Sequence, residues 1–217
     1  MSGPLLPRRT ALLGLAGLLG GCTGLETIGN VISPGDLFDL SPKSTFDEDL
    51  PEVTAQIVVE EPIAASSVNT DRIAIKPTPL QVQYFANARW VDRAPRLVQT
   101  LMVESFENTG RVAAVGRQAI GLVSDYTLIT DLREFTADVF GSPNGDTRIV
   151  VQINIKIVQE PQGQIVASRS FGQELTSSSD AVADIVRVFD EALGSSMRDA
   201  VEWTVREIAT LEAQRRF

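Results

Sequence analysis

Reactive side chains are scarce in this chain, and Cys22 has the clearest chemical context among them. It is the only cysteine in 217 residues. A basic pair at positions 8–9, an apolar run over residues 10–19 and the small pair Gly20-Gly21 precede it, which is the layout of an export signal with a cleavage site. The apolar run is too short for a permanent membrane span, which needs about 20 residues.

The residues Leu19-Gly20-Gly21-Cys22 resemble a bacterial lipobox. The resemblance implies cleavage between Gly21 and Cys22. It also implies a diacylglycerol on the Cys22 thiol, with or without a further acyl chain on the new amino terminus. Such chains hold a protein on a membrane, because each buried CH₂ contributes about 0.8 kcal/mol. A lone structural cysteine is the alternative interpretation.

Two neighbouring features bear on export and sorting. Thr23 follows the cysteine, where an aspartate commonly retains lipoproteins in the inner membrane, so this resemblance favours the outer membrane over the inner. Arg8 and Arg9 loosely resemble a twin-arginine signal, which leaves the Sec and twin-arginine routes both open. We expect a lipid-anchored protein that faces the periplasm of the bacterial cell envelope.

The amino-acid composition narrows the functions that are possible for the part of the chain after Cys22. Loss of Arg8 and Arg9 with the signal would lower the net charge from −9 to −11, which argues against a nucleic-acid partner. Histidine is absent, so the usual general base and commonest metal ligand are missing. The serines at 177–179 fit a helix cap better than a nucleophile. We expect no enzymatic activity, no metal and no cofactor beyond the acyl groups.

The chain divides into three parts by composition. Residues 1–21 form the predicted signal peptide, and residues 22–54 are rich in Gly, Pro, Ser and acids, as expected of a lipidated tether. Residues 55–217 then form a single domain. Within the tether, Leu37–Leu40 fits a short strand, and the acidic residues 47–49 fit a solvated loop better than a calcium loop.

The first half of the domain combines short strands with one helix. Strands are expected at 56–60, 72–76 and 81–85. The last two are separated by Pro77-Thr78-Pro79, a spacing that suits a hairpin-like connection in which the prolines exclude ladder pairing. A helix capped by Asp92 and ended by Gly110 follows, and it buries a stripe of apolar residues at helical spacing. The stripe consists of Leu97, Val98, Leu101, Met102 and Phe106.

Tyr84, Phe85 and Trp90 stand before this helix. Packing of strand against helix is one interpretation of Tyr84 and Trp90, and contact with a ligand or partner is the other. The run from Tyr84 to Trp90 and the helix that closes on Gly110-Arg111-Val112 resemble the ABC-type transport auxiliary lipoproteins. This is the family of paraquat-inducible protein C, whose members accompany MCE-domain lipid transporters.

The second half of the domain predicts an antiparallel meander and a long helix. Residues 126–139 alternate with one break, which a bulge near Arg133 and Glu134 would explain, and residues 151–157 alternate without a break. Apolar residues then recur at helical spacing from Val182 to Leu211, with a predicted weak point at Gly194. We therefore predict an α/β fold of the α+β type, with a mixed, mostly antiparallel sheet of about six strands and two helices on one face.

The resemblance implies a non-catalytic lipoprotein subunit that anchors or caps the conduit of an MCE protein. That protein would work with an inner-membrane ABC permease and ATPase, and the family also suggests a homo-oligomer. A different class remains open: an envelope-assembly or cargo-binding lipoprotein that holds a lipid or peptide between sheet and helices. An apolar groove around Tyr84, Phe85 and Trp90 would favour this alternative.

Overall fold

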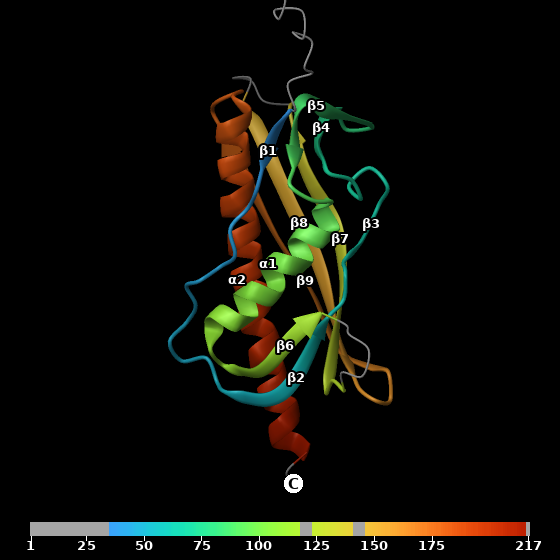
Figure 1. Ribbon diagram of the computed structural model, residues 1–217, viewed down its shortest axis with the longest axis vertical. Helices are drawn as coiled ribbons and strands as arrows, with labels where there is room; N and C mark the ends of the chain where they lie inside the picture. Colours follow the sequence, from blue (N-terminus) through green and yellow to red (C-terminus); the bar gives the residue numbers. More distant parts are fainter. Residues whose placement is uncertain (1–34, 118–122, 141–145, 216–217) are drawn as a thin grey trace, which may run out of the picture. The chain divides into compact units, whose positions relative to one another are not determined.

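The computed structural model describes residues 35–117, 123–140 and 146–215, within a compact unit that begins at Gly35 (Figure 1). The predicted signal peptide, its cleavage position at Gly21 and the predicted lipidation site Cys22 lie outside the described residues. Within the described ranges, neither helix has the length and apolar character needed to cross a membrane.

The described ranges contain nine strands and two helices. The strands are β1 (Asp36–Phe38), β2 (Val53–Val59), β3 (Ile63–Ala64), β4 (Arg72–Thr78), β5 (Gln81–Trp90), β6 (Val112–Arg117), β7 (Tyr126–Asp138), β8 (Thr147–Gln159) and β9 (Gln164–Ser177). The helices are α1 (Ala94–Thr109) and α2 (Val182–Arg215). The α/β class is confirmed, but the expected number of about six strands is too low, because a strand as short as β3 shows no periodicity in the sequence.

The sheet is built around β7. One edge of β7 pairs with β8 over its whole length, and β8 pairs with β9, so the predicted antiparallel meander is confirmed. The other edge of β7 pairs in parallel with β2, β3 and β4 in succession. β6 extends the sheet beyond β2, and β5 and β1 extend it beyond β4. On this edge, β2 therefore pairs with the beginning of β7 and β4 pairs with its end.

A bulge interrupts the ladder between β7 and β8 where the sequence predicts it. Leu132 pairs with Ile153, whereas Glu134 pairs with the adjacent Gln152, so Arg133 is the extra residue. An extra residue reverses the side-chain alternation beyond it. This is why the apolar positions of the two halves of β7 are out of phase in the sequence.

Helix α1 ends as predicted but begins one residue later. Gly110 adopts a left-handed conformation with φ 60°, which favours glycine after a helix. The N-cap position belongs to Arg93 rather than to Asp92. Asp92 instead accepts a hydrogen bond from the Arg93 N–H at 2.7 Å and pairs with Arg96 at 3.2 Å. The predicted apolar stripe of α1 is buried throughout.

Helix α2 continues through the predicted weak point without interruption. Gly194 and Ser196 are buried, and the Ser196 hydroxyl donates to the Ala192 carbonyl at 2.9 Å. This bond to the carbonyl four residues earlier satisfies the buried hydroxyl within the helix, although such bonds slightly weaken a helix. α2 packs along β8 and β9 and contacts α1, where Ser105 lies 3.9 Å from the Met197 sulfur. Figure 1 shows α1 crossing α2 obliquely over the sheet.

The predicted hairpin-like connection is confirmed, because β4 and β5 pair antiparallel, but the ladder extends further into the connection than predicted. β4 includes Pro77, and the pair Thr78 and Gln81 closes the ladder around the turn at Pro79 and Leu80. The prolines therefore do not exclude pairing within the connection, since Thr78 is paired. A register shift between Ile75 and Thr78 accommodates Pro77, which has no N–H to donate.

The folded unit includes much of the segment that composition assigns to a tether. Leu40 and Leu50 are buried in the core, and β1 pairs with β5. Polar contacts fix the rest of this segment. The Ser41 N–H donates to Asp190 at 2.6 Å, and the Lys43 N–H donates to Ser105 at 2.9 Å. The compact unit thus starts at Gly35 rather than at residue 55.

Candidate functional site

Trp90 lies in the centre of the core. Its side chain is 1% exposed, and its ring centroid is 5.4 Å from those of Phe135 and Phe189. Phe135 and Phe189 are themselves 4.9 Å apart, so β5, β7 and α2 meet at one aromatic cluster. Tilted and edge-on rings at these distances attract one another beyond simple area burial. Trp90 therefore pins strand to helix and is not accessible from solvent.

Tyr84 and Phe85 have different surroundings. The Tyr84 hydroxyl donates to the Ser67 carbonyl at 3.2 Å, and the Arg72 guanidinium lies 3.9 Å above its ring. Phe85 is partly buried against the core. The structure thus does not bring Tyr84 and Trp90 together at one open surface. Their positions favour the packing interpretation over an apolar cargo groove.

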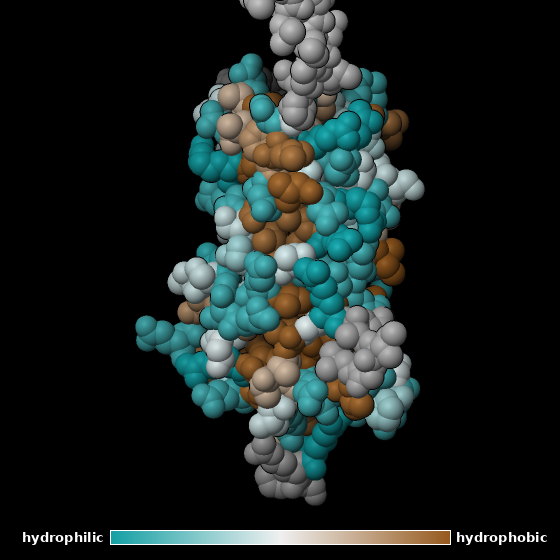
Figure 2. Space-filling view, viewed as in Figure 1, coloured by the Kyte–Doolittle hydropathy of each residue, from teal (hydrophilic) through white to brown (hydrophobic). Residues whose placement is uncertain are grey.

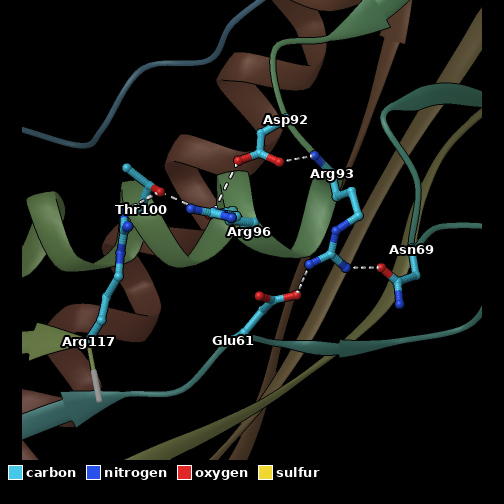
Figure 3. A network of polar contacts seen from close by, with 7 residues as sticks. All are labelled: Glu61, Asn69, Asp92, Arg93, Arg96, Thr100 and Arg117. Atoms are coloured by element: carbon cyan, nitrogen blue, oxygen red, sulfur yellow. Dashed lines mark hydrogen bonds and ion pairs between the residues drawn. The ribbon is translucent and has the colours of Figure 1, made fainter. Parts of the chain in front are cut away.

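A polar network that the sequence did not indicate surrounds the start of α1 (Figure 3). The Arg93 guanidinium donates to Glu61 at 2.6 Å and to Asn69 at 2.5 Å. Arg96 pairs with Asp92 one turn earlier in the chain. These contacts connect α1 to the segment between β2 and β4. No periodic pattern reveals such a network, because its members come from separate parts of the chain.

An open pocket of about 390 Å³ adjoins this network. Its lining consists of Glu60, Glu61, Arg96, Gln99 and Arg117. Gln99 is 8% exposed and donates to the Val59 carbonyl at 2.9 Å, while Arg117 donates to the Thr100 hydroxyl at 2.5 Å. The charges of the lining balance, so the pocket suits a polar or zwitterionic group better than an acyl chain.

Two of the three acidic residues at positions 47–49, Asp47 and Asp49, pair with α2. The Arg206 guanidinium lies 3.0 Å from Asp47 and 2.9 Å from Asp49. Its hydrogen bond and charge lower the pKa of Asp49 below the ordinary 3.8. In the described part of the chain, no group of three or more acidic, cysteine or histidine residues is arranged to hold a metal ion.

The model of a known protein family matches the sequence of this chain. The family is described as the ABC-type transport auxiliary lipoprotein component, and its model matches residues 38–201. That span covers more than half of the chain. The chain belongs to this family. The resemblance carried by the block from Tyr84 to Val115 is therefore confirmed, and the chain is an auxiliary lipoprotein component by family.

Solved structures share the fold of this auxiliary lipoprotein. The crystal structure of protein XCC0632 from Xanthomonas campestris, of family DUF330, has a TM-score of 0.76 at 29% identity and covers 83% of this chain and 99% of its own. The crystal structure of another, uncharacterized protein has a TM-score of 0.57 at 18% identity, covering 77% of this chain and 99% of its own. This second likeness supports the fold alone.

A curated relative is longer than this auxiliary lipoprotein. It is an uncharacterized protein of Bradyrhizobium diazoefficiens, 29% identical over 170 residues. The match covers 77% of this chain and 44% of the relative, so the chain spans less than half of the relative's length.

Proposed function

We propose that this chain is a non-catalytic, periplasm-facing lipoprotein subunit of an envelope lipid-transport system. In this system an MCE-domain protein provides the conduit, and an ABC permease and ATPase work in the inner membrane. The family match over residues 38–201 carries the proposal, because that family is an auxiliary component of ABC-type transport. The lipobox-like sequence that ends at Cys22 supports the membrane anchor.

The proposed role is mechanical. Acyl chains on Cys22 hold the body at a membrane, and the body anchors or caps the conduit of the MCE protein. Exposed ion pairs connect α1 and α2 to segments distant in the sequence, Arg93 with Glu61 and Arg206 with Asp47, and such contacts suit a body that acts as one unit.

A pull-down from detergent-solubilised envelopes tests the partners. The tagged full chain is expected to recover an MCE protein together with the permease and ATPase. The control carries Cys22→Ser behind a cleavable signal that has no lipobox: it cannot be acylated, so it is expected in the soluble fraction. Repeated recovery of the acylated chain without an MCE protein would contradict the proposal.

The outer membrane is the proposed site of the anchor, on the basis of Thr23. Membrane fractions separated by density are expected to place the wild-type chain with the outer membrane. A Thr23→Asp change is expected to move it to the inner membrane. If the wild-type chain and the Thr23→Asp variant are both recovered in the inner-membrane fraction, the chain is not transferred to the outer membrane.

A homo-oligomer is part of the proposal. β9 has 14 residues and, among the described strands, pairs with β8 alone. A long open edge can pair with a strand of another copy. Light scattering of the detergent-solubilised chain is expected to give a mass above that of one copy, and a monomeric mass at all concentrations would contradict self-association.

A further inference from the structure

The turn of the β4–β5 hairpin projects from one end of the folded unit and carries two exposed apolar side chains. We call residues 77–83 the hairpin tip. Leu80 is 98% exposed and Val82 is 39% exposed. In Figures 1 and 2 this hairpin projects at the upper right and carries hydrophobic surface there. A single exposed leucine is common in proteins, so exposure alone does not make a site.

The absence of charge distinguishes this hairpin within the sequence. No Asp, Glu, Lys or Arg occurs from Pro77 to Ala88, although 22% of all residues are charged and the net charge is −9. An acidic body is repelled by the anionic surface of a bilayer. A neutral projection with apolar side chains can enter the interface without that penalty or the cost of burying a charge.

The proposed anchor leaves the folded unit beside the same hairpin. Gly35 lies against β5, where a Cβ on Gly35 would be 2.9 Å from the Asn87 carbonyl oxygen. Residues 23–34 separate Cys22 from Gly35. A chain of this length spans at most about 45 Å when fully extended and about 20 Å as a random coil. Acylated Cys22 would therefore keep this end of the body near the bilayer.

We propose that the hairpin tip contacts the lipid surface of the membrane that holds the anchor, with Leu80 and Val82 inserted at the interface. This inference rests on the proposed acylation of Cys22. Prolines at 77 and 79 restrict the turn, so insertion costs little backbone entropy. The tip thereby sets the orientation of the body, because an acyl tether alone leaves the body free to rotate.

A fluorescent label at the tip tests the contact. The full, acylated chain carrying Leu80→Cys presents one free thiol, because the only native cysteine is modified. It is labelled with an environment-sensitive dye and reconstituted in phosphatidylethanolamine and phosphatidylglycerol vesicles that contain a lipid-bound quencher. Ile165→Cys is the matched control: Ile165 is an apolar residue, 55% exposed, beside the β8–β9 turn at the other end of β7.

The expected result is a blue-shifted, quenched label at position 80 and an aqueous, unquenched label at position 165. In a second test, a label at Gln83→Cys is expected to lose its quenching when Leu80→Asp is added. Burial of a leucine side chain corresponds to at least about a tenfold shift in the docked population.

Mass analysis of the N-terminal peptide separates two kinds of failure. If Cys22 is acylated and labels at 80 and 165 behave alike, the inference is wrong while the proposed anchor stands. If Cys22 carries no acyl chain, the proposed anchor fails and the inference fails with it. If the emission at position 80 changes only when envelope proteins are added, and the lipid-bound quencher has no effect, the tip contacts a protein partner. This result would overturn the inference.

Discussion

The two tyrosines of the chain differ in how their hydroxyl groups are satisfied. Tyr84 donates to the Ser67 carbonyl at 3.2 Å. Tyr126 is fully buried, and its hydroxyl has no hydrogen-bond partner among the described residues. Burial also raises the pKa of Tyr126 above 10.0. A buried polar group without a partner costs stability, whereas a bonded one contributes modestly.

The tyrosines therefore provide a matched pair of substitutions. Tyr126→Phe is expected to leave the free energy of unfolding unchanged or to increase it by up to about 1 kcal/mol. Tyr84→Phe is expected to lower it by about 1 kcal/mol through loss of one hydrogen bond. Urea unfolding of both variants measures this difference. A larger loss in Tyr126→Phe than in Tyr84→Phe would show that the Tyr126 hydroxyl has a partner.

The pairing of Asp49 with Arg206 makes one part of the stability depend on pH. The pKa of Asp49 is lowered in the folded chain by Arg206, relative to its ordinary 3.8. The stabilisation is therefore complete above the ordinary value and is lost as the pH falls below about 4. Arg206→Gln should lower stability at neutral pH, and the gap to wild type should close in acid. Unfolding midpoints across this range provide the measurement, and a gap independent of pH would contradict it.

At the scale of elements, α1 depends on the left-handed residue that ends it. Gly110 has φ 60°, which a side chain disfavours. Gly110→Ala is expected to destabilise the fold by about 1 kcal/mol. Gly116→Ala in β6 is the control, because an added Cβ there meets nothing within 4 Å. Thermal unfolding compares the two, and equal losses would show that the conformation of Gly110 is not the cause.

At the scale of the whole unit, residues 35–54 bind the helices and the sheet together. Leu40 and Leu50 enter the core, and Asp47 and Asp49 pair with α2. A chain beginning at Ala55 is expected to lose several kcal/mol of stability, because each buried leucine contributes about 1.5–3 kcal/mol. A chain beginning at Gly35 should keep the stability of the full body. Equal unfolding midpoints for the two would show that the segment adds nothing.

The sequence by itself determined the local features of this protein. The alternation in β7 and β8, the bulge at Arg133, the stripe of α1 and its end at Gly110 all follow from residues close together in the chain. The block from Tyr84 to Val115 also identified the family. Local backbone geometry sets these periodicities, so neighbouring residues record them.

Only the tertiary structure decided which distant segments meet. It placed Trp90 between Phe135 and Phe189, arranged β2, β3 and β4 along one edge of β7, and joined Arg93 to Glu61. It also moved the start of the folded unit to Gly35. Contacts between remote segments depend on how the whole core packs, and no pattern within a short stretch of sequence records that.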